Sequence, residues 1–397
     1  MKQKTISFSI ILIATLIFSC CWVDEDPLPT PGRTVIVYMA ADNSLNSYSY
    51  DNIKDMVKGA GGENLNNGKL LVYHDSASEP PRLINIKKGA SGEIEQEIVR
   101  TYEDRNSVDV GVMRSVLADI FNDEDYRSDS YGLVLWSHGT AWLPADVKNY
   151  LRSYGQDETN YMEIYDLKEA LKGYTFDFII FDDCYMANIE VAYTLRDNTG
   201  YILASPTEVL ADGLPYHYVI KYMFEKGNTS RSLKKIASAF YSYYNEQLGG
   251  SNLPKSASTA LVETAGLDAL AAVCREILMG KEEDILNLTV ENIQLLEYLR
   301  ATKYHALYDF ADFIKQLATP DQYARFEAAL ENVVVYKETT DVAFFGYGGS
   351  GSDYGSGLIV PIDKERFCGI SVYVPQRNLE SLNEWYKRLD WYKSVYE

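Results

Sequence analysis

Short runs of apolar residues recur along the chain and alternate with segments that have helical spacing. Six runs are apolar at nearly every position, which is typical of strands buried on both faces of a sheet. The segments between them, such as 109–121, 165–171 and 187–195, repeat apolar residues every three to four positions. This alternation predicts an α/β fold with a mostly parallel sheet flanked by helices. The six predicted strands are Thr34–Met39, Leu70–His74, Tyr131–Trp136, Asp177–Phe181, Tyr201–Ala204 and Gly369–Val374.

The pattern changes beyond about residue 230, where helical spacing dominates as far as residue 337. The stretch Gly346–Gly357 is rich in glycine and serine and predicts a loop before the last apolar run. We expect a core over residues 33–230 and a helix-rich C-terminal elaboration over 231–397, packed with its returning strand or strands on the same sheet. A separate helical subdomain is the alternative.

The N-terminus has the pattern of an export signal. Lys2 and Lys4 precede an apolar run from Ile6 to Phe18, which is too short for a free-standing transmembrane helix and predicts a signal peptide over residues 1–20. The run ends in Ile17-Phe18-Ser19-Cys20, which resembles a bacterial lipobox, so we expect lipidation of Cys20. Ordinary secretion with nearby cleavage is the alternative. The acidic, proline-rich residues 21–32 predict a tether, and the whole predicts a protein anchored to a bacterial outer membrane, at the cell surface in one interpretation.

Composition narrows the classes of partner. The formal net charge is −20, which argues against nucleic acid because no phosphate-neutralising basic surface is evident. Cys20 and Cys21 belong to the leader, leaving Cys184, Cys274 and Cys368 in the mature chain. An odd number does not indicate a disulfide framework, and the apolar settings of Cys274 and Cys368 predict core positions. We expect a monomer.

Two of the predicted strands end in polar residues that suit catalysis. Tyr131–Trp136 leads into His138, and Asp177–Phe181 leads into Cys184. In an open α/β sheet the loops after the carboxyl ends of strands form the ligand crevice, so neighbouring strands would bring these side chains together. Cysteine would be the nucleophile and histidine the acid/base, with the backbone N–H groups of Gly139 and Cys184 as oxyanion donors. A helix that begins directly after Cys184 would favour the thiolate.

Plainer interpretations remain open from the residues alone. A buried cysteine commonly serves packing, and a histidine after a strand is commonly a structural hydrogen-bonding group. Asp182, Asp183 and His138 would also serve as metal ligands. The remaining histidines are expected to be structural: His74, His217 and His305.

Several motifs together resemble the clostripain family of clan CD cysteine peptidases, peptidase family C11. That family carries a Tyr-Met-Ala-Ala-Asp segment, a Trp-x-His-Gly motif and an Asp-x-Cys-x-Met motif, and the resemblance extends from about residue 33 to 397. The matching segments here are Tyr38–Asn43, Trp136–Gly139, Asp182–Met186, Ile189–Tyr193, Ala204-Ser205, Asp212–Tyr216 and Gly369–Pro375.

The resemblance implies a caspase-like fold and a cysteine endopeptidase with Cys184 and His138 as its dyad. It implies an acidic S1 pocket that selects Arg over Lys, formed by Asp182 and Asp212, with Glu208 as the fallback. It further implies a zymogen that cuts itself between the two catalytic motifs, and we expect cleavage after Arg152, with Lys148 second. No cofactor is required, although some relatives respond to calcium.

One departure from the family pattern leaves a second function open. The family often has further glycines after His-Gly, whereas this chain has Thr140-Ala141-Trp142, which would alter the oxyanion loop or narrow the site. The alternative function is therefore an inactive caspase-like surface lipoprotein that binds peptide or glycan.

Overall fold

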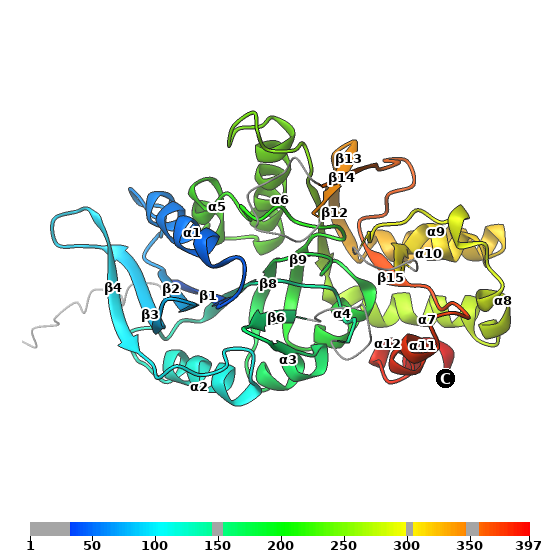
Figure 1. Ribbon diagram of the computed structural model, residues 1–397, viewed down its shortest axis with the longest axis horizontal. Helices are drawn as coiled ribbons and strands as arrows, with labels where there is room; N and C mark the ends of the chain where they lie inside the picture. Colours follow the sequence, from blue (N-terminus) through cyan, green and yellow to red (C-terminus); the bar gives the residue numbers. More distant parts are fainter. Residues whose placement is uncertain (1–31, 145–153, 299–304, 347–356) are drawn as a thin grey trace, which may run out of the picture. The chain divides into compact units, whose positions relative to one another are not determined.

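Nine strands form one central sheet in the computed structural model, which describes residues 32–144, 154–298, 305–346 and 357–397 (Figure 1). The strand order is β12-β10-β9-β8-β5-β1-β2-β3-β4, and the five inner strands from β9 to β2 are parallel. This confirms the predicted fold class. The inner strands are β1 (Arg33–Ala41), β2 (Lys69–Ser76), β5 (Ser130–Trp136), β8 (Phe176–Asp182) and β9 (Thr199–Ala204).

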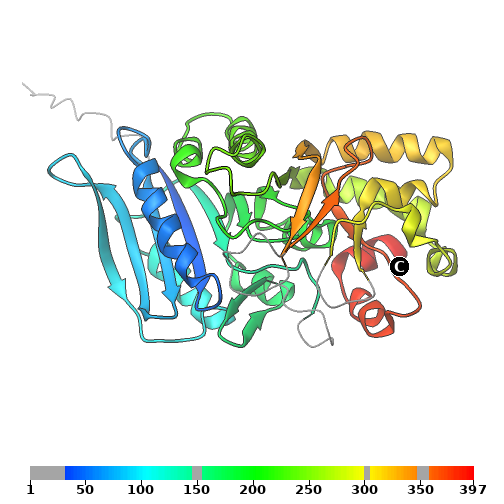
Figure 2. The same cartoon turned by 45° about the horizontal axis from the view of Figure 1, so that its top comes forward.

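The inner strands are apolar at nearly every position because helices cover both faces of the sheet. Along β1, Ile36 and Tyr38 face one hydrophobic core, and Val35 and Val37 face the other. Helices α1 (Asn46–Gly59), α5 (Tyr216–Met223) and α6 (Thr229–Asn245) cover the second face. The first face is covered by α2 (Val110–Phe121), α3 (Ile164–Ala170), α4 (Ile189–Leu195) and α7 (Leu267–Leu278) (Figures 1 and 2).

Antiparallel strands extend both edges of the sheet. On one edge lie β3 (Glu79–Lys88) and β4 (Ile94–Thr101), and on the other lie β10 (Ser258–Glu263) and β12 (Val334–Thr339). β10 and β12 come from the C-terminal region in which helical spacing dominates the sequence. Helices and strands of the C-terminal region therefore build on the same sheet.

The predicted strand Gly369–Val374 lies outside the central sheet. Its counterpart β15 (Ser371–Tyr373) pairs with β11 (Leu307–Asp309), and Ser371 bridges to Asn188 next to α4. Two further small sheets pair β6 (Tyr154–Asp157) with β7 (Asn160–Met162), and β13 (Val342–Phe345) with β14 (Leu358–Pro361).

The C-terminal region adds short helices around α7. Two of them begin at well-formed caps: Thr319 forms a capping box with Gln322 at the start of α10, and Asp309 caps α9. α10 and α12 both contact α7, which joins this region to the helical layer of the sheet. The helices are α8 (Glu282–Leu286), α9 (Phe310–Lys315), α10 (Pro320–Glu331), α11 (Glu380–Tyr386) and α12 (Asp390–Tyr396), with 3₁₀ turns at Thr264–Gly266 and Val290–Asn292.

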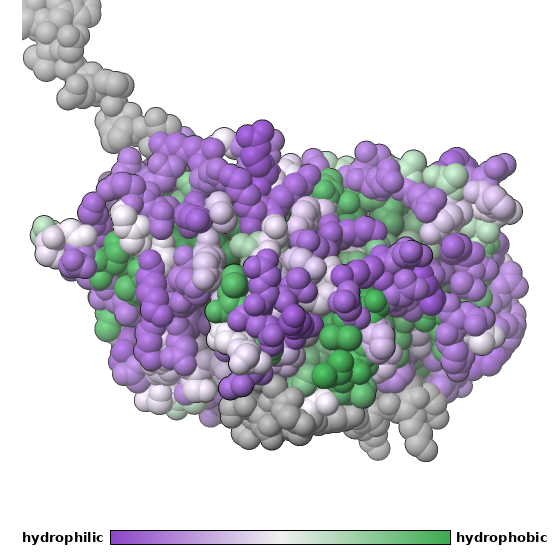
Figure 3. Space-filling model, turned by 90° about the horizontal axis from the view of Figure 1, so that it is seen from above, coloured by the Kyte–Doolittle hydropathy of each residue, from purple (hydrophilic) through white to green (hydrophobic). Residues whose placement is uncertain are grey.

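The surface is largely polar, in keeping with the acidic composition. The face seen from above is mostly hydrophilic, with smaller hydrophobic patches between the polar side chains (Figure 3). Within the described ranges, no helix combines the length and the apolar character needed to cross a bilayer.

Candidate active site

His138 and Cys184 follow two neighbouring parallel strands. β5 pairs with β8 in a register that places Trp136 opposite Asp182. His138 comes two residues after Trp136, and Cys184 comes two residues after Asp182. Because parallel strands end at the same edge of a sheet, both motifs emerge side by side at its carboxyl edge.

The two motifs also touch directly at Gly139. A Cβ atom added to Gly139 would lie 2.8 Å from the carbonyl oxygen of Cys184 and 3.0 Å from Cγ of Asp183. Distances below 3.0 Å are not tolerated between such atoms, so only glycine allows the His-Gly turn to pack against the cysteine turn. This close approach explains why glycine follows the histidine.

The Cys184 thiol is held by the backbone of Val209. The amide N–H of Val209 donates to Sγ at 3.2 Å, and Sγ lies 3.6 Å from the Val209 carbonyl oxygen. The side chain partly reaches the surface but lies deep among protein atoms. Burial, and then the carboxylate of Glu208, raise the pKa of Cys184 well above its usual range. In this state Cys184 is a neutral thiol.

The helix after Cys184 begins later than the sequence indicates, so the dipole argument for the thiolate is wrong in its simple form. α4 starts at Ile189, five residues beyond Cys184, where Asn188 caps it. Tyr185 intervenes in the left-handed region with φ of 66°, and its N–H donates to the carbonyl oxygen of Thr207. The cysteine turn is thus fixed by the 205–209 segment instead of by a helix N-terminus.

His138 is half-buried, and its ring is bonded to a residue that the sequence analysis missed. Nε2 of His138 lies 3.0 Å from Oγ of Ser44, in the loop after β1. β1 is the other neighbour of β5 in the sheet. A polar residue just past a third strand end was the available signal, because Ser44 follows the end of β1 by three residues, and His138 and Cys184 follow the ends of their strands by two.

Asp182 is buried and fully engaged inside the protein. Its carboxylate accepts hydrogen bonds from the N–H of Leu214, at 3.0 and 3.2 Å, and from the hydroxyl of Tyr216, at 2.7 Å. Burial raises the pKa of Asp182 to about 6, although these two donors act in the opposite direction. Asp182 therefore anchors the 212–216 segment to the end of β8.

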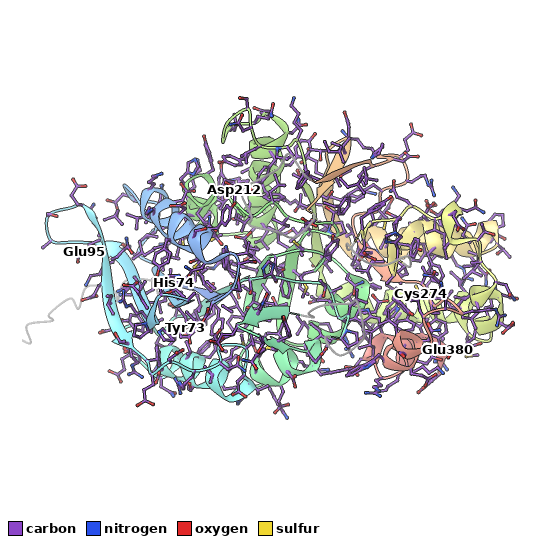
Figure 4. All side chains as sticks on the ribbon, in the orientation of Figure 1. Tyr73, His74, Glu95, Asp212, Cys274 and Glu380 are labelled. Atoms are coloured by element: carbon purple, nitrogen blue, oxygen red, sulfur yellow. The ribbon has the colours of Figure 1, made fainter. Side chains whose placement is uncertain are left out.

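Asp212 begins that anchored segment, and Glu208 precedes it by four residues. Asp212 is half-buried just before α5, where its carbonyl oxygen accepts a bond of 2.9 Å from the Asn52 side chain (Figure 4). Glu208 accepts from the Gly346 N–H at 2.7 Å and from the Tyr185 hydroxyl at 3.4 Å. Of these two carboxylates, that of Glu208 contributes to the raised pKa of Cys184.

Asp183 is the unexpected member of the cysteine turn. Its side chain is 2% exposed, and neither carboxyl oxygen has a hydrogen-bond partner among the residues that the structure describes. Burial, and then the nearby Asp182, raise the pKa of Asp183 well above its usual range. An unpaired carboxylate would be costly at this depth, so Asp183 is held as the neutral acid.

The loop that departs from the family pattern is buried in an aromatic cluster. Ala141 is in the left-handed region with φ of 55°, and Trp142 is 1% exposed. The Trp142 ring stacks on Tyr386 and meets Tyr373 edge-on, with ring centroids 5.7 and 5.3 Å apart. The indole therefore packs against the C-terminal region, and this packing holds the loop in place.

The other histidines have partners away from this site. His74 bonds to Ser49 at 2.8 Å, and burial lowers the pKa of His74 to about 4, so it is neutral (Figure 4). His217 contacts Asp55 at 2.5 Å, and His305 lies 3.6 Å from Glu297. Among residues 32–144, 154–298, 305–346 and 357–397, no three His, Cys, Asp or Glu side chains form a metal-binding group. The sequence-based alternative of a metal held by Asp182, Asp183 and His138 gains no support.

Several residues with predicted roles lie outside the part of the chain that the structure describes. The expected cleavage positions Lys148 and Arg152, the lipidated Cys20, the signal peptide and the tether up to residue 31 lie outside the described residues.

Comparisons with known proteins agree with this geometry. The sequence model of the Clostripain family matches residues 37–397. An inactive zymogen C11 protease from Parabacteroides distasonis is 41% identical, with a TM-score of 0.82, covering 94% of this chain and 100% of its own. A secreted C11 cysteine protease from Bacteroides thetaiotaomicron, solved in complex with an irreversible peptide inhibitor, is 33% identical, with a TM-score of 0.79, covering 92% of this chain and 99% of its own. A comparison with curated proteins finds no match.

Proposed function

The chain belongs to the clostripain family of cysteine peptidases, and from that premise we propose that it cleaves peptide bonds with a dyad of Cys184 and His138. The observation that carries the proposal is the contact between the two motifs at Gly139, which brings the histidine and cysteine turns together at one edge of the sheet. The inhibitor-bound relative supports it by analogy, because that cysteine protease of the same fold was solved in complex with an irreversible peptide inhibitor.

The proposed chemistry proceeds in balanced steps. His138 takes the proton of the Cys184 thiol, and the thiolate attacks the carbonyl carbon of the scissile bond. The carbonyl electrons move onto oxygen, and the N–H groups of Gly139 and Cys184 are the proposed donors that stabilise the oxyanion. When the tetrahedral intermediate collapses, the C–N bond breaks and His138 protonates the leaving amine. Water then attacks the thioester by the same route and regenerates the thiol.

The proposed substrate preference is a basic residue at P1, Arg before Lys. Asp212 is the better candidate for direct contact, because its side chain is half-buried before α5, whereas Asp182 is committed to Leu214 and Tyr216. Asp182 would act by holding the 212–216 segment in place. Glu208, close enough to influence Cys184, is the second carboxylate that a cationic side chain would meet.

We propose self-cleavage between the catalytic motifs, after Arg152 and secondarily after Lys148. The zymogen relative shows that a protein 41% identical to this chain exists in an inactive precursor form. Protein carrying Cys184→Ala should therefore accumulate uncut, and Arg152→Ala should move the cut to Lys148. Cleavage of purified Cys184→Ala protein on its own would rule out this step.

We also propose that Cys20 is acylated and anchors the protein in a bacterial outer membrane. The support is the order of Lys2, Lys4, the apolar run and Ile17–Cys20. Labelling cells with palmitate should mark the wild type and leave the Cys20→Ala protein unlabelled. Equal labelling of both would reject the anchor.

The test of the proposed function is a panel of fluorogenic peptides that differ only at P1: Arg, Lys, Asp or Leu. We expect hydrolysis of the Arg and Lys peptides and none by Cys184→Ala or His138→Ala protein. Preference for Asp or Leu would reject the acidic pocket alone.

A further inference from the structure

Each of three adjacent strands is followed by one polar residue at the same edge of the sheet. β8, β5 and β1 are consecutive in the strand order, and Cys184, His138 and Ser44 follow them by two, two and three residues. The histidine is the middle member of this row. On the side of β1, its Nε2 atom lies 3.0 Å from the Ser44 hydroxyl oxygen.

The loop that carries Ser44 is fixed by its neighbour Asn43. The Asn43 Oδ1 atom accepts from the Leu45 N–H at 2.8 Å. Its Nδ2 group donates to the carbonyl oxygens of Ala40, at 2.9 Å, and Gln156, at 2.8 Å. These bonds tie the loop to the end of β1 and to the β6–β7 hairpin. Ser44 itself is exposed, so its position is set by this loop and not by packing of its own side chain.

A histidine that exchanges protons needs a defined tautomer and ring orientation, and the partner of the distal nitrogen sets both. We propose that Ser44 is a positioning residue for His138: its hydroxyl accepts a hydrogen bond from Nε2–H and thereby directs Nδ1 toward Cys184. This inference rests on the proposed dyad. In the proposed cleavage, Nδ1 of His138 takes the thiol proton and later gives it to the leaving amine. The proton on Nε2 stays on the ring throughout.

The same hydrogen bond stabilises the imidazolium when Nδ1 is protonated, because a charged donor binds an oxygen more strongly than a neutral one. Loss of the Ser44 hydroxyl should therefore lower kcat about ten- to hundredfold, within the ~10²–10⁴ that acid–base catalysis contributes. KM should change by no more than about twofold, because Ser44 is not assigned a contact with the substrate.

The variants are Ser44→Ala, the conservative rescue Ser44→Thr, and the control Ser47→Ala. Ser47 is an exposed serine three residues away, in the first turn of α1. Kinetics are measured on full-length protein with equal cleavage states. We expect Ser44→Thr and Ser47→Ala to keep kcat close to that of the wild type, and Ser44→Ala to lose it without a change in thermal stability.

A spectroscopic measurement separates positioning from a merely structural role. The chain has four histidines, so ¹⁵N-histidine labelling of the Cys184→Ala protein resolves their tautomers by NMR. We expect His138 as the Nε2–H tautomer, and a mixture of tautomers once Ser44→Ala is added. An unchanged tautomer and unchanged kcat in Ser44→Ala would overturn the inference.

Different results test the dyad and the role of Ser44. Activity retained by Cys184→Ala or His138→Ala would overturn the dyad, and with it the basis for Ser44. Loss of activity in both, together with wild-type kinetics in Ser44→Ala, would overturn the role of Ser44 alone.

Discussion

The backbone amide of Val209 donates a hydrogen bond to Sγ of Cys184 at 3.2 Å, and the Val209 carbonyl oxygen lies 3.6 Å from the same sulfur. Val209 thus contacts the Cys184 sulfur with both its backbone donor and its backbone acceptor. Burial and the nearby Glu208 raise the pKa of Cys184, and the hydrogen bond from the Val209 N–H acts in the opposite direction without offsetting them, so the thiol keeps its proton in this state.

The first prediction concerns the ionisation of that thiol. Because the Glu208 carboxylate raises the pKa of Cys184, Glu208→Gln should lower it and increase the thiolate fraction at neutral pH. The rate of alkylation by iodoacetamide at pH 7.5 should rise about two- to tenfold, and its pH midpoint should fall. Glu246→Gln, an exposed residue at the end of α6, is the control. Identical midpoints in wild type and Glu208→Gln would contradict this electrostatic account.

The second prediction concerns the contact between the two motifs. In Gly139→Ala the new methyl group would meet the Cys184 carbonyl oxygen at 2.8 Å, so one of the turns must move. We expect a loss of ~1–3 kcal/mol in the free energy of unfolding and at least ~10² in kcat, since an oxyanion donor is displaced. Gly200→Ala is the control, because its added Cβ would have only an ordinary contact of 3.4 Å. Unaltered kcat in Gly139→Ala would show that the turns are not packed as described.

The inner part of the fold was predictable because burial on both faces leaves continuous apolar runs, as in β1 and β8. The edge strands were not, since β4 is largely exposed and reads as polar sequence. β10 lies within a helix-rich region, and its pairing with β9 and β12 identifies it. β15 is as apolar as an inner strand, yet it pairs with β11 instead, because burial does not specify the partner.

The meeting of the two motifs was predictable, because His138 and Cys184 each follow a buried strand and those strands are neighbours in the sheet. Val209 could not be inferred, because a tertiary contact that sequence spacing does not encode brings it to Cys184, whereas the position of Ser44 just past the end of β1 was a weak signal for its contact with His138. The delayed start of α4 has a local cause: the left-handed Tyr185 and the cap at Asn188 interrupt a pattern that is otherwise helical.

The third prediction concerns Asp183 and pH. Its pKa is raised in the folded protein, so the folded state holds this proton more tightly than the unfolded chain, whose Asp pKa is about 3.9. This group therefore supports folding at low pH, and its contribution is lost as pH rises above about 4, with a slope of at most ~1.4 kcal/mol per pH unit. Asp183→Asn should remove that loss. In urea unfolding, its free energy of unfolding relative to that of its parent should therefore increase from pH 4 upward.

Both proteins for that measurement carry Cys184→Ala, which prevents self-cleavage in the proposed scheme. Asp129→Asn, at an exposed position, is the matched control and should run parallel to its parent. If Asp183→Asn also ran parallel to its parent across pH 4–8, Asp183 would not be a buried neutral acid.

The fourth prediction concerns specificity. Asp212→Asn should lower kcat/KM for an Arg P1 peptide about 30- to 100-fold, equivalent to ~2–3 kcal/mol for the lost charged partner. Hydrolysis of a slow Leu P1 peptide should not fall, because no cation is involved. Asp51→Asn, an exposed residue of α1, is the control. Asp182→Asn should instead reduce thermal stability, since it weakens the bonds to Leu214 and Tyr216. An equal fall in kcat/KM for both peptides in Asp212→Asn would contradict a contact between Asp212 and the basic P1 side chain.

The most direct test of the central claim is to identify the nucleophile by mass. A peptide ending in Arg and carrying an electrophilic ketone should add once to the wild-type protein, and digestion should place the adduct on Cys184. His138→Ala should slow this addition, and Cys184→Ala should abolish it. The buried thiols Cys274 and Cys368 should stay unmodified. An adduct on either of those residues, or on the Cys184→Ala protein, would contradict the assignment of Cys184 as the catalytic nucleophile.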